Sequence, residues 1–129
     1  EYLNIEINGG FKTLDSIKDA LTKVDAVMIG RASYEDCYLL ADLNKLNDEN
    51  TKIISRGEII KSYIPYVKEE LERGSNVHSL AAPLQSLFQG QNGSRKFKQI
   101  LSSSNVKKET LVATLNELLE IMPQDILWI

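Results

Sequence analysis

Two glycine-containing segments near the start of the chain carry residues that could bind an anion. Asn8, Gly9 and Gly10 follow one short apolar run, and Gly30 and Arg31 follow a second run about twenty residues later. Glycine leaves backbone N–H groups open to close approach by an anion, and a guanidinium forms charged hydrogen bonds to phosphate. The spacing fits two interpretations equally well. These residues form a phosphate site, or the glycines only make turns and Arg31 is a surface charge.

The surrounding residues predict the elements that would bring these segments together. Residues 3–7 and 26–29 are short apolar runs typical of strands, and residues 14–24 have helical spacing, with Thr13 placed to cap the helix. This order predicts a βαβ unit with parallel strands. In (β/α)8 barrels the last two strand ends, with a short helix after them, commonly hold a phosphate. Residues 32–40 could begin that helix and point its N-terminal dipole at the same anion.

The second part of the chain predicts only helices. The polar residues 44–52 separate a domain at 1–44 from an all-α bundle domain at 45–129. Ser55 and Glu58 form a capping box that opens a helix ending at Gly74. Three further helices are predicted around the apolar residues that follow: Leu80, Leu84 and Leu87; Phe97, Ile100 and Leu101; and Leu111, Leu115, Leu118 and Met122, before Pro123.

Composition narrows the classes of function. With 129 residues, one cysteine and one histidine, the chain offers neither a disulfide nor a metal-ligand cluster, so no metal is predicted. The longest apolar runs are far shorter than the roughly 20 residues that cross a bilayer, so we expect a cytoplasmic protein with no membrane partner. A net charge of −3 argues against a dedicated nucleic-acid binder, so any RNA contact must be local.

One basic cluster could make such a contact. Arg95, Lys96 and Lys98 surround Phe97, which we interpret as a core anchor rather than a base-stacking platform. These cations are RNA-binding candidates, and the alternative is a solvated helix face, which is where most charge runs lie.

Three segments resemble a known family. "EINGGFKTLDSIKDAL", "VDAVMIGRASYEDCYLLA" and "LFQGQNGSRKFKQIL" are similar to the C-terminal portion of A-type tRNA-dihydrouridine synthases over most of residues 1–104. The resemblance implies that Asn8, Gly9 and Gly10, with Gly30 and Arg31, hold the phosphate of FMN. It also implies NADPH as reductant and a C-terminal helical domain that helps to seat tRNA.

The same resemblance implies a mostly helical α/β fragment. The chain would supply two of about eight strands of the (β/α)8 TIM barrel, followed by the helical bundle. The family's active-site cysteine belongs to an earlier loop, so no catalytic residue is expected here, and the fragment should be inactive alone. The uncovered barrel faces of Ile5, Ile7, Val27 and Ile29 should favour self-association.

Some residues depart from the family or carry no role. Cys37 is interpreted as a packing thiol in a helix, and His78 as a core or surface residue. Many relatives carry an Arg-His pair where Ala82 and Pro83 stand, which weakens the case for RNA contact by that helix. Trp128 either packs back on the bundle or marks an exposed contact surface.

Three functions therefore remain open. The favoured one is part of a flavin-dependent tRNA-dihydrouridine synthase, which reduces uridine in tRNA. The second is another FMN or phosphate-binding barrel enzyme, because glycines at successive strand ends serve many substrates. The third is a non-catalytic RNA-binding or scaffold derivative of the synthase.

Overall fold

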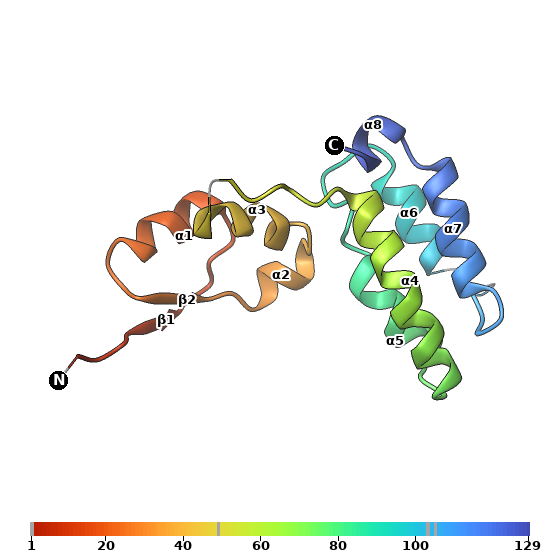
Figure 1. Ribbon diagram of the computed structural model, residues 1–129, viewed down its shortest axis with the longest axis horizontal. Helices are drawn as coiled ribbons and strands as arrows, with labels where there is room; N and C mark the ends of the chain where they lie inside the picture. The colour runs from red at the N-terminus through yellow and green to blue at the C-terminus, as the bar shows by residue number, and fades with distance from the viewer. Residues whose placement is uncertain (1, 49, 103, 105) are drawn as a thin grey trace. The chain divides into compact units, whose positions relative to one another are not determined.

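The computed structural model describes residues 2–48, 50–102, 104 and 106–129. The chain divides into two compact units, an N-terminal unit up to Ile53 and a helical unit from Ile54 on (Figure 1). The boundary expected at residues 44 and 45 lies inside helix α3 (Leu39–Asn47). Because the polar residues 44–47 are helical, the division falls later in the chain than their composition indicates.

The N-terminal unit contains the predicted parallel strand pair. Its elements are β1 (Glu6–Asn8), α1 (Leu14–Leu21), β2 (Ala26–Met28), α2 (Arg31–Glu35) and α3. In the parallel register Ile7 pairs with Val27 and Asn8 pairs with Met28. Helix α1 contacts β2 and α3, and α2 contacts α3. The strand-helix-strand order predicted for this part is therefore confirmed.

Local hydrogen bonds explain where these elements begin. The Thr13 side chain accepts a hydrogen bond from the Ser16 N–H at 3.3 Å, so Thr13 is the predicted N-cap of α1. The Asp25 carboxylate accepts a hydrogen bond from the Ile5 N–H at 2.8 Å, immediately before both strands start. Ile17 is the buried residue of α1. The cap thus marks the start of α1, and the Asp25 hydrogen bond ties the chain before β2 to the chain before β1.

Much of the apolar surface of the strands is exposed. Ile5 is 57% exposed, Ile7 40% and Met28 42%. Parallel strands are normally covered on both faces, so this apolar surface is unusual for an α/β protein.

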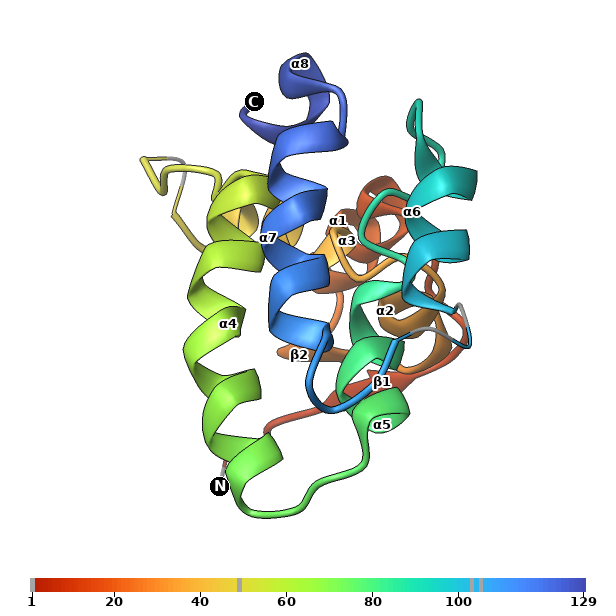
Figure 2. The ribbon, with the colours of Figure 1, turned by 90° about the vertical axis from the view of Figure 1, so that its right-hand side faces the viewer.

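The helical unit is built around one pair of helices. Its elements are α4 (Arg56–Glu72), α5 (Val77–Ala81), the 3-10 helix η1 (Ala82–Leu84), α6 (Ser94–Leu101), α7 (Leu111–Ile121) and α8 (Gln124–Leu127). Helices α4 and α7 lie side by side and run in opposite directions, with α6 next to α7 (Figure 2). The largest completely buried side chains include Ile60, Phe88, Phe97, Leu111 and Leu115. The capping box of Ser55 and Glu58 is present at the start of α4.

The second predicted helix of this unit is wrong in its extent. The apolar spacing of Leu80, Leu84 and Leu87 predicts one helix, but α5 ends at Ala81 and η1 follows. Pro83 has no N–H to donate, and the hydrogen bonding changes to the 3-10 pattern around it, with the Gln85 N–H donating to the Ala82 carbonyl at 3.2 Å. All three leucines are nevertheless buried. The periodicity therefore identified the core residues correctly and the element incorrectly.

The C-terminal residues pack back on the bundle. Helix α8 contacts α4, and a Cβ added at Gly57 would clash with the Trp128 ring. The Lys61 ammonium lies 4.5 Å from the centre of the same ring. Of the two alternatives for Trp128, packing on the bundle is the one observed, although 40% of the residue stays exposed.

Candidate functional site

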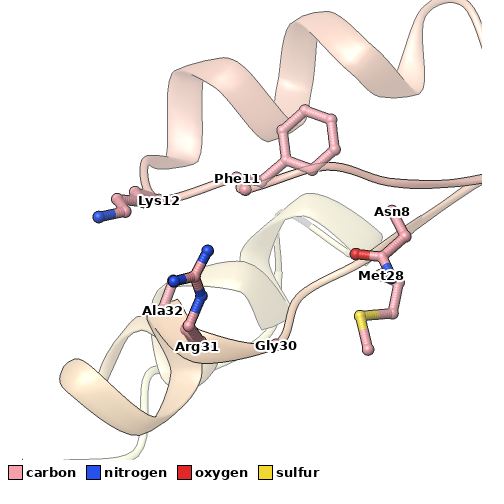
Figure 3. A pocket seen from close by; sticks show the side chains of 8 residues that line it. Asn8, Phe11, Lys12, Met28, Gly30, Arg31 and Ala32 are labelled. Atoms are coloured by element: carbon pink, nitrogen blue, oxygen red, sulfur yellow. The ribbon is translucent and has the colours of Figure 1, made fainter.

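The carboxyl ends of β1 and β2 form one pocket of about 180 Å³, which we call the strand-end pocket (Figure 3). Its lining residues are Asn8, Gly10, Phe11, Lys12, Met28, Gly30, Arg31 and Ala32. The parallel register brings the two segments together, because Asn8 and Met28 are paired at the strand ends. Of the five residues predicted to bind an anion, Gly9 alone does not line the pocket.

The polar groups of the strand-end pocket suit an anion. Arg31 and Lys12 supply two positive charges, and none of the eight lining residues is acidic. Figure 3 shows the Arg31 guanidinium directed toward the loop that carries Phe11 and Lys12. No hydrogen bond or ion pair joins this guanidinium to any residue that the structure describes, so its donors are available to a ligand.

Gly10 is required by the turn between β1 and α1. Its φ of +67° lies in the left-handed region, which residues with a side chain rarely adopt. A Cβ at this position would meet no atom within 4 Å, so the requirement comes from the backbone and not from crowding. The turn thus leaves an unshielded backbone at the edge of the pocket.

Two expectations about the residues after Arg31 need correction. Helix α2 has only five residues, so few peptide dipoles add up and its N-terminus contributes little to anion binding. Cys37 lies in the turn between α2 and α3 rather than in a helix, and it is half-buried. The positive charge of the pocket therefore comes from the Arg31 and Lys12 side chains rather than from the α2 dipole.

The size of the strand-end pocket limits what it can hold. Its volume of about 180 Å³ is well below the roughly 300–1,000 Å³ of pockets that enclose a drug-sized ligand. A phosphate-sized group fits such a space, and a whole flavin nucleotide does not. The pocket can therefore bind one end of a larger ligand.

A second hollow, of about 760 Å³, lies along α6, and we call it the α6 hollow. Its lining residues are Gln89, Gln91, Asn92, Gly93, Ser94, Arg95, Lys96, Lys98 and Gln99. The Lys98 ammonium donates a hydrogen bond to the Gln89 side-chain oxygen at 2.6 Å. All three predicted RNA-binding cations thus share one surface rich in amides and positive charge.

Buried residues under the α6 hollow hold its shape. Phe97 is completely buried, with its ring centre 4.6 Å from that of Phe88, so the expected core role of Phe97 is confirmed. Arg56 is also buried and donates from Nε to the Leu87 carbonyl at 2.8 Å. Sequence reasoning missed Arg56, because arginine is mostly exposed and nothing in the pattern around the capping box marks this one as buried.

Other candidate sites are not supported. His78 is exposed near the start of α5, so of the core and surface roles expected for it, the surface role is the one observed. Among the residues described, no group of three His, Cys, Asp or Glu side chains could hold a metal ion. None of the described helices has the length and apolar character needed to cross a membrane.

The described residues form an α/β unit with two cations in a pocket at its parallel strand ends, and a separate helical unit with three cations on one surface. The family model for dihydrouridine synthase (Dus) matches residues 2–125. The chain therefore belongs to the dihydrouridine synthase family.

Three relatives illustrate the similarity, and each is named tRNA-dihydrouridine(20/20a) synthase. The chain is 41% identical over 105 residues to the protein of Synechocystis sp., covering 81% of this chain and 31% of the relative. It is 34% identical to the protein of Pseudomonas putida, covering 93% and 36%, and 32% identical to that of Haemophilus ducreyi, covering 95% and 38%. The chain thus spans about a third of the length of these curated relatives.

Proposed function

We propose that a protein carrying this segment reduces uridine in tRNA to 5,6-dihydrouridine, with FMN as cofactor and NADPH as reductant. The observation that carries the proposal is the strand-end pocket, which joins Asn8, Gly30 and Arg31 around an anion-sized space in a chain of the dihydrouridine synthase family. The names of the relatives specify positions 20 and 20a of tRNA, and we extend this target to the protein.

In this proposal the strand-end pocket holds the phosphate of FMN. The Arg31 guanidinium and the Asn8 amide donate hydrogen bonds to its oxygens, and the unshielded backbone at Gly9, Gly10 and Gly30 allows the phosphate to approach closely. The bound cofactor would supply the hydride that reduces the uracil ring. The two cations and the absence of acidic lining residues fit this group, and the small volume fits its phosphate end alone.

The helical unit supplies a tRNA-docking surface in the same proposal. Arg95, Lys96 and Lys98 neutralise phosphates along the α6 hollow, while its amide side chains can donate to and accept from ribose hydroxyls. The net charge of −3 means that the attraction is confined to this surface rather than spread over the chain. Docking of this kind positions the tRNA and performs no chemistry.

The exposed strand surface fits a larger barrel. Ile5, Ile7 and Met28 would be covered by neighbouring strands and helices of a complete (β/α)8 fold. The residues that protonate the uracil ring would lie in that remainder, so this chain alone should be inactive. Self-association of the chain stays a prediction that no comparison supports.

The test is dihydrouridine formation by a full-length protein that carries this segment. With FMN, NADPH and tRNA, we expect dihydrouridine at positions 20 and 20a, measured by mass spectrometry of the digested tRNA. This chain supplied alone should give none. A full-length protein that binds tRNA but forms no dihydrouridine would contradict the proposal.

One observation favours the alternative of a non-catalytic RNA-binding or scaffold protein. Ala82 and Pro83, where the family resemblance implies an Arg-His pair, lie in η1 and add no charge there. Binding of tRNA without flavin and without dihydrouridine formation is the result that would favour an RNA-binding or scaffold protein. A tRNA substrate would be met in the cytoplasm, and this location stays a prediction.

A further inference from the structure

Lys12 is a second cation of the strand-end pocket that the glycine and arginine pattern does not include. It stands between the Gly10 turn and Thr13, which begins α1. Figure 3 shows Lys12 and Arg31 at the same end of the pocket, on opposite segments of the chain. Lys12 lies in the loop after β1, and Arg31 is the first residue of α2 after β2, so an anion would be approached from two sides.

Among the residues that the structure describes, the Lys12 ammonium has one acidic partner. Its Nζ lies 4.0 Å from a carboxylate oxygen of Glu35, the last residue of α2. The two side chains are 66% and 63% exposed, so water screens the pair and it is weak. The ammonium can therefore leave Glu35 at little cost.

We propose that Lys12 binds the phosphate of the ligand in the strand-end pocket and that Glu35 holds its ammonium when the pocket is empty. This inference rests on the proposed function, in which that phosphate belongs to FMN. A phosphate with nearly two negative charges and three acceptor oxygens attracts an ammonium more strongly than one solvated carboxylate. The long, flexible lysine stem allows the exchange without movement of the backbone.

The consequence is a preference for the phosphorylated flavin. Lys12 and Arg31 would both contact the phosphate, and neither would contact the ring system. Loss of Lys12 should therefore weaken binding of FMN and leave binding of riboflavin, which has no phosphate, unchanged. This contrast separates a direct phosphate contact from a general loss of folding.

The first experiment compares FMN and riboflavin binding to the full-length protein by flavin fluorescence. Lys12→Ala should weaken FMN binding by about tenfold, the size of one charged hydrogen bond, with no change for riboflavin. Lys12→Arg should restore most of the affinity, because it keeps the charge and the donors. Lys18→Ala, an exposed α1 lysine outside the pocket lining, is the control for net charge and should bind FMN normally.

The second experiment asks whether Glu35 competes for Lys12. Glu35→Gln should tighten FMN binding by about twofold to fivefold, the size of a released surface ion pair, in the protein that retains Lys12. In the Lys12→Ala background the same substitution should have a smaller effect, because no ammonium is left to release. Equal effects of Glu35→Gln in both backgrounds would overturn the exchange.

The outcomes also separate this inference from the proposed function. FMN binding that is equally tight in the wild-type protein and in Lys12→Ala would overturn the inference and leave the FMN site in place. An equal loss of FMN and riboflavin binding in Lys12→Ala would also overturn the inference, because a contact with the phosphate cannot affect riboflavin. Failure of the wild-type protein to bind FMN would overturn the proposed function, and the inference with it.

Discussion

Arg31 is the residue with the largest expected effect on anion binding. Its charge is permanent, and none of the described residues forms an ion pair with it. Arg31→Ala in the full-length protein should weaken FMN binding by about tenfold to a hundredfold, from the energy of charged hydrogen bonds. Arg31→Lys should weaken FMN binding less than Arg31→Ala does, because lysine keeps the positive charge. Some affinity should still be lost, since one ammonium replaces a two-pronged donor. Unchanged FMN affinity in an isothermal titration of Arg31→Ala would remove this residue from the site.

Glu70 makes the stability of the helical unit depend on pH. Its carboxylate accepts a hydrogen bond of 2.6 Å from the Ser75 hydroxyl, and this bond, with Arg73 nearby, lowers the pKa of Glu70 below 4.5. The stabilisation is complete above this ordinary value and is lost as the pH falls through the lowered pKa of the folded state.

Ser75→Ala tests this pH dependence, since it removes the main cause of the lowered pKa. We expect a smaller fall in melting temperature on acidification than in the unsubstituted chain, measured by circular dichroism at a series of pH values from neutral to below 4.5. Identical pH profiles for the two proteins would show that the hydrogen bond does not contribute.

Residue types revealed part of the strand-end pocket, and the reason is chemical. The spacing of Gly10 and Arg31 left a phosphate site and plain turns equally open, the family resemblance favoured the site, and the structure brings both residues to one pocket. Lys12 was missed because a single lysine in a polar loop has no distinguishing neighbours. Its place in the pocket depends on the backbone turn at Gly10, which the residue pattern does not specify.

At the scale of elements, periodicity predicted the core better than it predicted the boundaries. The βαβ order followed from two apolar runs and a capped helix, and the structure has it. Helix α5 stops at Ala81 although the leucine spacing continues, and the chain goes on as the 3-10 helix η1, which contains Pro83. The spacing reports which side chains are buried, while backbone hydrogen bonding decides where a helix ends.

The contact between α4 and the C-terminal residues predicts that the effect of Gly57→Ala on stability depends on Trp128. Gly57→Ala should destabilise the protein by about 1–3 kcal/mol, because the new Cβ would overlap the Trp128 ring. In a Trp128→Ala background the same change should be neutral or stabilising by up to about 1 kcal/mol, since alanine favours the helix. Chemical denaturation of the four proteins measures both effects. A destabilisation of equal size in the two backgrounds would contradict the contact.

The surface of α6 predicts salt-dependent tRNA binding. Replacing Arg95, Lys96 and Lys98 together by alanine should weaken tRNA binding and lower the slope of log affinity against log salt by about two to three. Filter binding at several salt concentrations measures this slope in the full-length protein. Lys68→Ala on α4 is the control, because Lys68 does not line the α6 hollow. A slope that stays the same in the triple variant would assign these cations to a solvated helix face.

At the scale of the whole molecule, the two units carry two parts of one proposed activity. The N-terminal unit would bind the cofactor by its phosphate, and the helical unit would bind the RNA. The polar segment and the helical periodicity after it predicted two units from the sequence, although they placed the boundary before the end of α3. The chain spans about a third of the length of its curated relatives, and the proposed catalytic residues lie outside the part that it matches.

The most direct test of the account is the visible absorption spectrum of the purified full-length protein, before and after addition of FMN. We predict flavin bands that remain with the protein through gel filtration and that weaken in Arg31→Ala. A protein that stays colourless after FMN is added would contradict the cofactor site, and the glycines at the strand ends would then serve only as turns.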